Sequence, residues 1–148
     1  MRGVVIVIFG LVTVLSATQR SSAGDTGHLG FSHGTVTNVC GPTDGIELLL
    51  LLTEKPLQCG QNTPRRYIRL SLDGPFPKTI AFPVKNPRLQ AFRCEDTGKG
   101  TSAEPAVSGT IRIDKSGHKG HYDLTFKNGA VESGDFQVGQ CMSRLICG

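Results

Sequence analysis

Three side chains in the last third of the chain are of types that bind metal ions or transfer protons: His118, His121 and Asp123. Residues two apart project from the same face of a strand, so His121 and Asp123 are expected side by side, with His118 in the turn before them. Two imidazoles and a carboxylate suit zinc or another transition metal. Polar residues are equally what the wet face of an antiparallel hairpin carries, and three nearby lysines oppose a cation. The pattern leaves two hypotheses, a metal site and a solvent-facing hairpin, and the second is the simpler.

The other candidates for catalysis form weaker patterns. His28 and His33 lie in a glycine-rich stretch near the expected mature N-terminus, where we expect irregular chain. Glu95, Asp96 and Glu104 fall in a polar stretch and are interpreted as solvated charge rather than as the paired carboxylates of a glycosidase. The glycines fall between expected strands, where turns need them, so no phosphate-binding motif is expected. We therefore predict no catalytic residue and no cofactor.

Five cysteines bear on the compartment and on covalent structure: Cys40, Cys59, Cys94, Cys141 and Cys147. None forms a C-x-x-C pair, so a structural zinc site is not expected. In an exported protein most cysteines pair, and an odd number leaves one thiol free or bonded to another molecule. Local loop closure and fraying of the chain end favour Cys40–Cys59 and Cys94–Cys141, with Cys147 left over, although other pairings stay open. The odd thiol also allows a covalent dimer.

The N-terminus has the three-part layout of a secretory signal peptide: Met1-Arg2, an uncharged apolar run over 3–15, and a polar stretch with small residues. The apolar run is shorter than the roughly 20 residues of a membrane-spanning helix, so cleavage and export are expected rather than a retained anchor. Small residues at the right spacing favour cleavage after Ala23, with Ala17 as the alternative. Residues 1–23 are thus predicted to be removed, leaving a single domain over 24–148 outside the cell or in the periplasm.

Charge and composition disfavour some classes of partner. The chain has 16 lysines and arginines against 12 acidic residues, a net charge of +4, and the expected signal peptide removes Arg2 and Arg20. Arg65, Arg66 and Arg69 form one small cluster, which is not the basic stripe of a nucleic-acid-binding protein. With no tryptophan and two tyrosines, the chain is poor in the aromatic anchors that dominate many interfaces. We expect no nucleic-acid partner and no membrane span after cleavage.

The elements that must position these residues are short strands, since apolar runs alternate with turn residues at the spacing of sandwiches and barrels. No window shows sustained helical periodicity. The run 46–53 is largely apolar, which predicts a strand buried on both faces, and Pro83 places the strand around it at a sheet edge. Strands are predicted over 35–39, 46–53, 66–72, 79–84, 89–94, 107–114 and 121–127, with a further one from Val131, and a polar, mobile loop over 95–104.

The segment 117–129 gives the clearest local prediction. Asn128-Gly129 favours a type I′ turn, because both positions tolerate positive φ. The preceding strand alternates, and three of its residues are expected to face the core: Tyr122, Leu124 and Phe126. Val131 and Phe136 are an odd number of positions apart and cannot both face inward on a regular strand, so a bulge is predicted near Ser133-Gly134.

Together these patterns predict an all-β, disulfide-stabilised antiparallel sandwich or small barrel of about eight strands. We interpret the protein as a secreted binding or structural domain without catalytic activity, whose partner is an extracellular protein or a small ligand. The loop 95–104 is the leading candidate for recognition, because loops on a rigid scaffold carry function. Two alternatives stay open: a carrier that encloses a small ligand in a barrel, and a secreted metal-dependent hydrolase that uses His118, His121 and Asp123.

Overall fold

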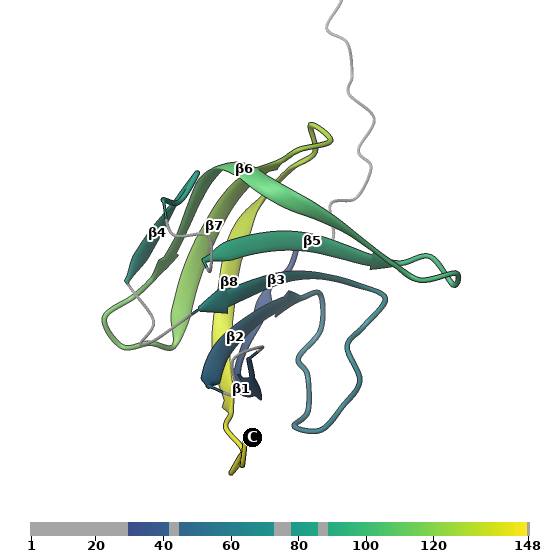
Figure 1. The fold of residues 1–148 in the computed structure, drawn as a ribbon. Helices are drawn as coiled ribbons and strands as arrows, with labels where there is room; N and C mark the ends of the chain where they lie inside the picture. The colour runs from purple at the N-terminus through teal and green to yellow at the C-terminus, as the bar shows by residue number, and fades with distance from the viewer. Residues whose placement is uncertain (1–29, 42–44, 73–77, 86–88, 148) are drawn as a thin grey trace, which may run out of the picture.

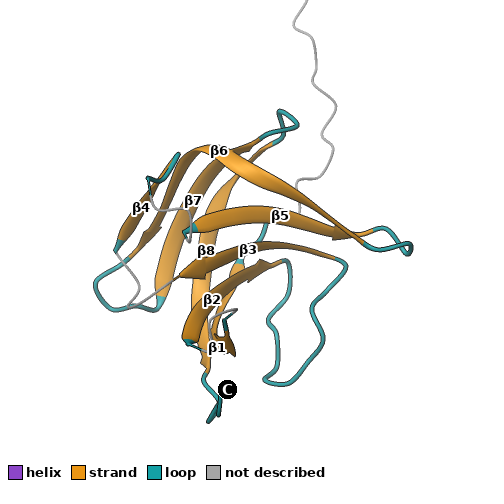
Figure 2. Ribbon diagram, viewed as in Figure 1, coloured by secondary structure: helices purple, strands orange, loops and turns teal. Residues whose placement is uncertain are grey.

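The computed structural model describes residues 30–41, 45–72, 78–85 and 89–147. Eight strands run through this part of the chain, and no helix occurs in it (Figure 1; Figure 2). Each strand overlaps one that alternation and turn residues predicted, although β6 begins six residues earlier than expected. Their bounds are β1 His33–Cys40, β2 Ile46–Thr53, β3 Arg66–Leu72, β4 Thr79–Phe82, β5 Gln90–Asp96, β6 Thr101–Ile113, β7 Lys119–Phe126 and β8 Val131–Cys141.

Seven of the strands close into a barrel in the order β1-β2-β3-β5-β6-β7-β8, and β8 pairs back to β1. The ring closes through β6, which pairs with β5 along its first part and with β7 along 106–113. Every pair is antiparallel except β1 and β8, which are parallel. The all-β prediction is therefore confirmed in its barrel form, with one parallel pairing. β4 pairs only with β6, which confirms the edge position predicted from Pro83.

Side chains fill the interior of the barrel. The buried cluster draws on all eight strands and includes Phe31, which lies just before β1. The predicted inward face of β7 is confirmed, since Tyr122, Leu124 and Phe126 are all essentially inaccessible to solvent. The full cluster is Phe31, Val36, Leu50, Leu52, Ile68, Leu70, Ile80, Phe82, Ala91, Ile111, Tyr122, Leu124, Phe126 and Phe136.

β2 is buried on both faces in its second half, as its run of leucines predicted. Leu50 and Leu52 face the interior, while Leu51 and Thr53 on the outer face are also buried. The Thr53 hydroxyl donates to the Lys55 carbonyl at 2.6 Å, which turns the chain back after β2. Pro56 and Leu57 of the connection to β3 share a hollow with residues of β1 and β8.

The predicted mobile loop over 95–104 is wrong. β5 continues to Asp96 and β6 begins at Thr101, and the two strands stay in register through these polar residues. Only 97–100 forms a turn, in which the amide and hydroxyl of Thr97 both donate to the Gly100 carbonyl, at 2.9 and 2.8 Å. Polarity suggested a loop, but an exposed ladder of backbone hydrogen bonds accepts polar side chains equally well.

The bulge predicted near Ser133-Gly134 is also wrong. β7 and β8 pair in unbroken register, with Tyr122 opposite Gly134. Regular alternation therefore leaves Val131 exposed and turns Glu132 into the barrel. Glycine at 134 makes room for the tyrosine, because a Cβ atom there would lie 3.2 Å from the Tyr122 hydroxyl. A charged residue faces inward where the apolar Val131 was expected.

The hairpin at Asn128-Gly129 forms, but not as a type I′ turn. The Gly129 amide donates to the Phe126 carbonyl, and the Phe126 amide donates to the Ala130 carbonyl. These bonds define a three-residue loop over 127–129, in which Gly129 takes a positive φ of 85°. The Asn128 side chain accepts from the Ala130 amide at 3.0 Å. Three-residue hairpin loops commonly consist of a type I turn followed by one residue in the left-handed conformation. Glycine supplies that residue here.

The disulfide pairing predicted from local closure is wrong. The bonds are Cys40–Cys147 and Cys59–Cys141, and Cys94 is the buried free thiol. The parallel pairing of β1 and β8 explains this, because it carries the chain end along β1 towards Cys40. Two hydrogen bonds between the Asn38 side chain and the Ser143 backbone, at 2.6 and 2.8 Å, hold that end in place. The two disulfides indicate an oxidising environment.

The predicted signal peptide, with its cleavage after Ala23 or Ala17, lies outside the described residues. His28 lies outside them as well. Within the described ranges, no helix is long and apolar enough to span a membrane.

Candidate functional site

The described residues give no geometric support to a three-residue site at His118, His121 and Asp123. His121 and Asp123 both face solvent on β7, but His121 pairs across to β8, with its Nδ1 2.8 Å from Oδ1 of Asp135. His118 lies in the preceding turn, where its amide donates to Asp114. Within the described ranges, no group of three histidine, cysteine or acidic residues is arranged to hold a metal ion. The simpler hypothesis, a polar outer face of a hairpin, describes what the structure shows here.

The turn that carries His118 is organised by Asp114. Its carboxylate accepts hydrogen bonds from the Ser116 hydroxyl and from the amides of His118 and Lys119. The Ser116 hydrogen bond is the main reason that the pKa of Asp114 lies below its usual range. Asp114 therefore stabilises the turn. This structural role explains the polar residues of the segment without a bound ligand.

Residues 30–34 read Gly-Phe-Ser-His-Gly, a spacing that matches the nucleophile elbow of hydrolases. The Ser32 hydroxyl and His33 Nδ1 lie 3.1 Å apart. The elbow requires a strand, a sharp turn and a helix, whereas His33 begins β1 directly. No ion pair among the described residues joins His33 to a carboxylate. The motif therefore lacks both the backbone and the third group that would activate Ser32.

A more developed site lies in the connection between β2 and β3. Segment 54–65 follows β2 and leads into β3. Pro56 lies near its start and Pro64 near its end, and a proline has no amide hydrogen to donate. Between the prolines, the Gln58 amide donates to Oε1 of Gln61 at 3.1 Å, and the Gln61 amide donates to the Gln58 carbonyl at 3.0 Å. The Cys59–Cys141 bond ties the tip of the segment to the end of β8. The segment is thus held at both ends and at its tip.

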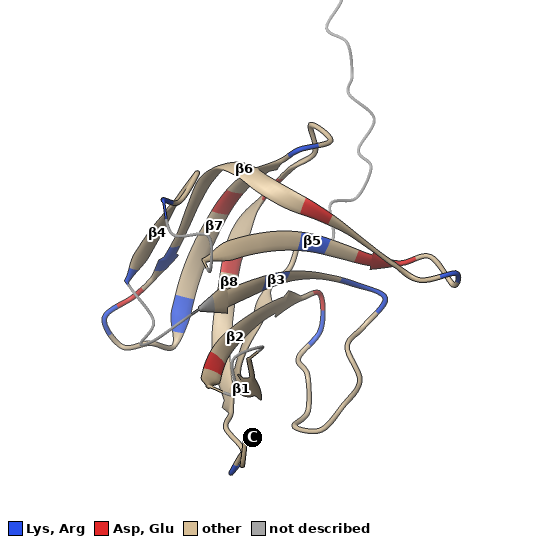
Figure 3. Cartoon of the chain, in the orientation of Figure 1, with Lys and Arg blue, Asp and Glu red and all other residues tan. Residues whose placement is uncertain are grey.

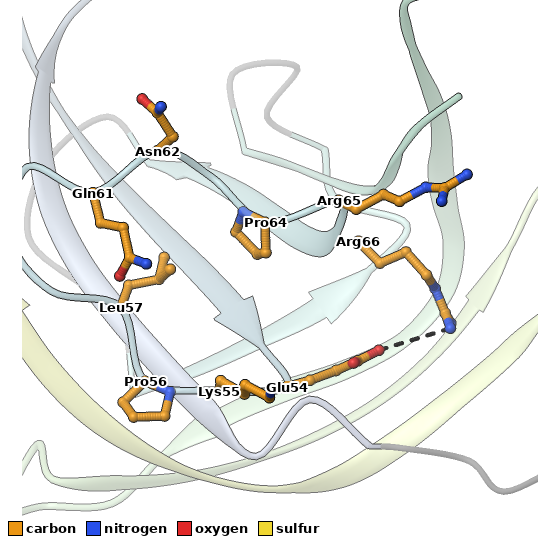
Figure 4. Close-up of a pocket in the computed structure, with 9 residues that line it drawn as sticks. All are labelled: Glu54, Lys55, Pro56, Leu57, Gln61, Asn62, Pro64, Arg65 and Arg66. Carbon is orange, nitrogen blue, oxygen red and sulfur yellow. Dashed lines mark ion pairs between the residues drawn. The ribbon is translucent and has the colours of Figure 1, made fainter. Parts of the chain in front are cut away.

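These constraints leave a cleft of about 410 Å³ between the two arms of the segment (Figure 4). The close-up shows Gln61 and Leu57 pointing towards one another across one side, with Pro64 above and Asn62 turned away. Arg66 reaches down to Glu54 on the opposite side, at 3.7 Å. We call this hollow the cleft, and its described lining is Glu54, Lys55, Pro56, Leu57, Gln61, Asn62, Pro64, Arg65 and Arg66.

Arg66 connects the cleft to the barrel interior. Besides Glu54, its guanidinium lies 3.8 Å from Oε1 of Glu132, and the same oxygen lies 3.4 Å from Nε of Arg93. Glu132 is only 7% exposed in its side chain, whereas Arg93 is 21% and Arg66 39% exposed. A buried carboxylate is tolerated when cations and hydrogen bonds satisfy it. The network therefore fixes the position of Arg66 at the rim of the cleft.

Phe31 completes that end of the barrel. Its ring is fully buried, its amide donates to the Tyr122 hydroxyl at 2.9 Å, and the Arg66 guanidinium lies 5.9 Å from the ring centre. Burial, together with the negative charge of Glu132, raises the pKa of Tyr122. Tyr122 therefore stays a neutral hydroxyl that accepts the Phe31 hydrogen bond.

Sequence reasoning missed the cleft and the Glu132 network, although signals for both exist. A connection of about 12 residues between strands is long for a compact domain and is often functional. This one also holds two prolines and a cysteine. For Glu132, unbroken alternation backwards from Phe136 would have placed it inside, had a bulge not been assumed. The cluster of Arg65 and Arg66 was noticed, but as surface charge.

Charge elsewhere is mixed. Lysine and arginine share the strands and turns with aspartate and glutamate, and the described part of the chain shows no stripe of one sign (Figure 3). Comparison of this chain with known protein families, with curated proteins and with solved structures finds no match. Its function is accordingly argued from its own geometry.

Proposed function

We propose that this protein is a secreted, non-catalytic binding protein that recognises its ligand in the cleft. The observation that carries the proposal is a hollow of about 410 Å³ whose walls are fixed by covalent and hydrogen bonds. Ligand sites are typically preformed hollows of this size, with apolar walls and a few polar groups. A fixed wall also avoids the entropic cost of ordering a loop on binding, which favours affinity.

The chemistry of the lining supports binding over catalysis. Its nine described residues include no histidine, cysteine, serine or threonine. A serine, cysteine or threonine nucleophile with a histidine base is therefore not among these residues. Pro56, Leu57 and Pro64 offer apolar contact, and the Gln61 amide together with Arg66 offers hydrogen bonds that would orient a ligand.

The packed core favours this proposal over a carrier. An eight-stranded barrel that carries a ligand keeps space inside it, whereas here aromatic and aliphatic side chains occupy the interior. Secretion is supported by the signal-like N-terminus and by two disulfides, since such bonds persist in oxidising compartments.

The recognition site proposed here differs from the one that polarity suggested. The segment 95–104 is mostly strand, and its turn at 97–100 offers only a narrow tip. Segment 54–65, by contrast, builds walls around a hollow. The proposal therefore places recognition between β2 and β3 instead of between β5 and β6.

A fragment screen by two-dimensional amide NMR tests the site even though the natural ligand is unidentified. Fragments that bind should shift the amide signals of 54–66 and leave those of the hairpin turn at 127–129 unchanged. Gln61→Trp should abolish these shifts, because the indole would occupy the cleft from an exposed position. Hits that cluster elsewhere on the barrel, or no hits at all, would overturn the proposal.

Gln58→Trp is the matched control. Gln58 is exposed in the same segment but does not line the cleft, so it adds the same ring outside the site. Both substitutions keep the backbone hydrogen bond from Gln61 to Gln58, and only Gln61→Trp removes the side-chain oxygen that accepts from the Gln58 amide. Equal loss of binding in the two variants would mean that the segment responds to bulk and not to occupation of the cleft.

A further inference from the structure

A second hollow lies on the outer face of the barrel, with no residue in common with the cleft. It has a volume of about 340 Å³, and its lining comes from β3, β5 and β6: Tyr67, Arg69, Phe92, Cys94, Thr101 and Ala103. The strand register brings these residues together, because Tyr67 pairs with Cys94 and Arg69 pairs with Phe92. Alternation then places both pairs on the side of the sheet opposite the packed interior. We call this site the Arg69 hollow.

Arg69 is the one charged residue in that described lining. Its cross-strand neighbours are Leu51 and Phe92, and the residues two positions away on β3 are Tyr67 and Ser71. All four are uncharged, and Arg69 takes part in none of the ion pairs among the described residues. Within this part of the chain, an exposed guanidinium with five N–H donors thus stands among uncharged neighbours, without an acidic partner.

The walls and floor of the Arg69 hollow are aromatic and neutral. Tyr67 and Phe92 are partly buried, and the Cys94 thiol donates to the Phe92 carbonyl at 3.9 Å. Cys94 is almost inaccessible to solvent, and this burial raises the pKa of its thiol. The thiol therefore stays protonated and acts as an apolar floor, not as a nucleophile.

We propose that the Arg69 hollow binds a small carboxylate that carries an aromatic ring. The planar guanidinium can hold a carboxylate through two parallel N–H···O bonds, and the lining contains no other charged residue that would compete for it. The ring of the ligand would pack against Tyr67 and Phe92 in an offset or edge-to-face arrangement. The site is separate from the cleft, so the inference goes beyond the proposed function.

Matched ligands test the two halves of this site. We expect 4-phenylbutyrate to bind about tenfold more tightly than its neutral amide, because only the acid can form charge-assisted hydrogen bonds with Arg69. Hexanoate, which keeps the charge but lacks the ring, should bind more weakly than 4-phenylbutyrate. Affinities are measured by amide NMR titration of the whole exported chain. The inference is overturned if acid and amide bind equally, or if 4-phenylbutyrate does not bind at millimolar concentration.

Variants locate the binding. Arg69→Gln should lower the affinity for the acid to that of the amide and leave the amide unchanged. Arg112→Gln is the control, because Arg112 is an exposed β6 arginine that does not line the hollow. Slow alkylation of Cys94 by iodoacetamide, followed by mass spectrometry, should become slower with the acid than with the amide. Equal effects of the two arginine variants, or no protection of Cys94, would place the ligand elsewhere.

Discussion

The cleft and the β7–β8 hairpin both carry charged pairs, but the two regions differ in what those pairs stabilise. At the cleft, Arg66 and Arg93 converge on Glu132, whose side chain is 7% exposed. On the hairpin, His121 pairs with Asp135, and these side chains are 51% and 90% exposed. Glu132 and Asp135 belong to the same strand and face opposite sides of it. Burial, and not residue type, therefore decides which pair the fold depends on.

The two regions also differ in how well their sequences indicate which residues matter for the structure. The hairpin has histidines and acidic residues close together in sequence, yet its pairs lie in water. The cleft region has no recognisable motif, yet it joins a disulfide, a buried carboxylate and a preformed hollow. Substitutions in each region, and changes of pH, test whether the cleft region contributes more to the free energy of unfolding than the hairpin does.

The largest effect is expected for Glu132→Ala. The change leaves Arg93 and Arg66 without their shared partner and opens space beside Tyr122, so the free energy of unfolding should fall by about 3–4 kcal/mol. This is the lower part of the range for breaking a buried pair, because both arginines keep some contact with solvent. Urea unfolding measures the loss, and Glu132→Gln should lose less. A midpoint equal to that of the unchanged protein would remove the contrast between the regions.

Loss of the Cys59–Cys141 bond should come next. The double change Cys59→Ala and Cys141→Ala frees the tip of segment 54–65 and should cost about 2–3 kcal/mol of unfolding free energy. Amide hydrogen exchange should accelerate across 54–65 while the hairpin stays protected. Cys40→Ala with Cys147→Ala is the control, since that bond holds the chain end and not the cleft. If both double variants loosen 54–65 equally, the disulfide does not shape the cleft.

Stability should also fall with rising pH through the buried thiol of Cys94 and the buried hydroxyl of Tyr122. Burial raises the pKa of Cys94 above its ordinary 9.0, and burial with the Glu132 charge raises that of Tyr122 above 10.0. Each group keeps its proton in the native state after the unfolded chain has lost it. Its contribution is therefore complete below its ordinary pKa and is lost as the pH rises towards the native value.

The slope is at most about 1.4 kcal/mol per pH unit for each such group. Cys94→Ala should flatten the first part of the decline, from about pH 9, and Tyr122→Phe the part above about pH 10. Tyr67 acts in the same direction as Tyr122, because burial raises its pKa too. Urea unfolding at several alkaline pH values gives the curve. An unchanged decline in Cys94→Ala would show that its thiol does not contribute.

Much of the fold could be predicted because its signals are local. Alternation along β7 and the turn at Asn128-Gly129 depend on neighbouring residues, and they placed the strands and the inward face correctly. The disulfides could not be predicted in the same way. They follow from the parallel pairing of β1 and β8, the first and last of the eight described strands, which leaves no periodic trace in the sequence.

The candidate site was harder to predict for a related reason. The cleft depends on how segment 54–65 lies against the barrel, which the Cys59–Cys141 bond and the Thr53 hydrogen bond decide together. Glu132 was missed because apolar Val131 was expected inside, and a bulge was assumed to permit it. The register instead exposes the valine and buries the acid, since Arg93 and Arg66 are there to receive it.

The smallest effect is expected on the hairpin itself. Asp135→Asn removes the charged partner of His121 without changing the shape of the side chain, and both residues are largely exposed. Water and salt screen such a pair, so the free energy of unfolding should change by less than about 0.5 kcal/mol. Urea unfolding at low and high salt measures it beside Glu132→Gln, the same acid-to-amide change three positions earlier on the inner face. If Asp135→Asn lowers the free energy of unfolding as much as Glu132→Gln does, exposure does not determine the contribution of these pairs. The charged pair on the hairpin would then matter as much as the buried one.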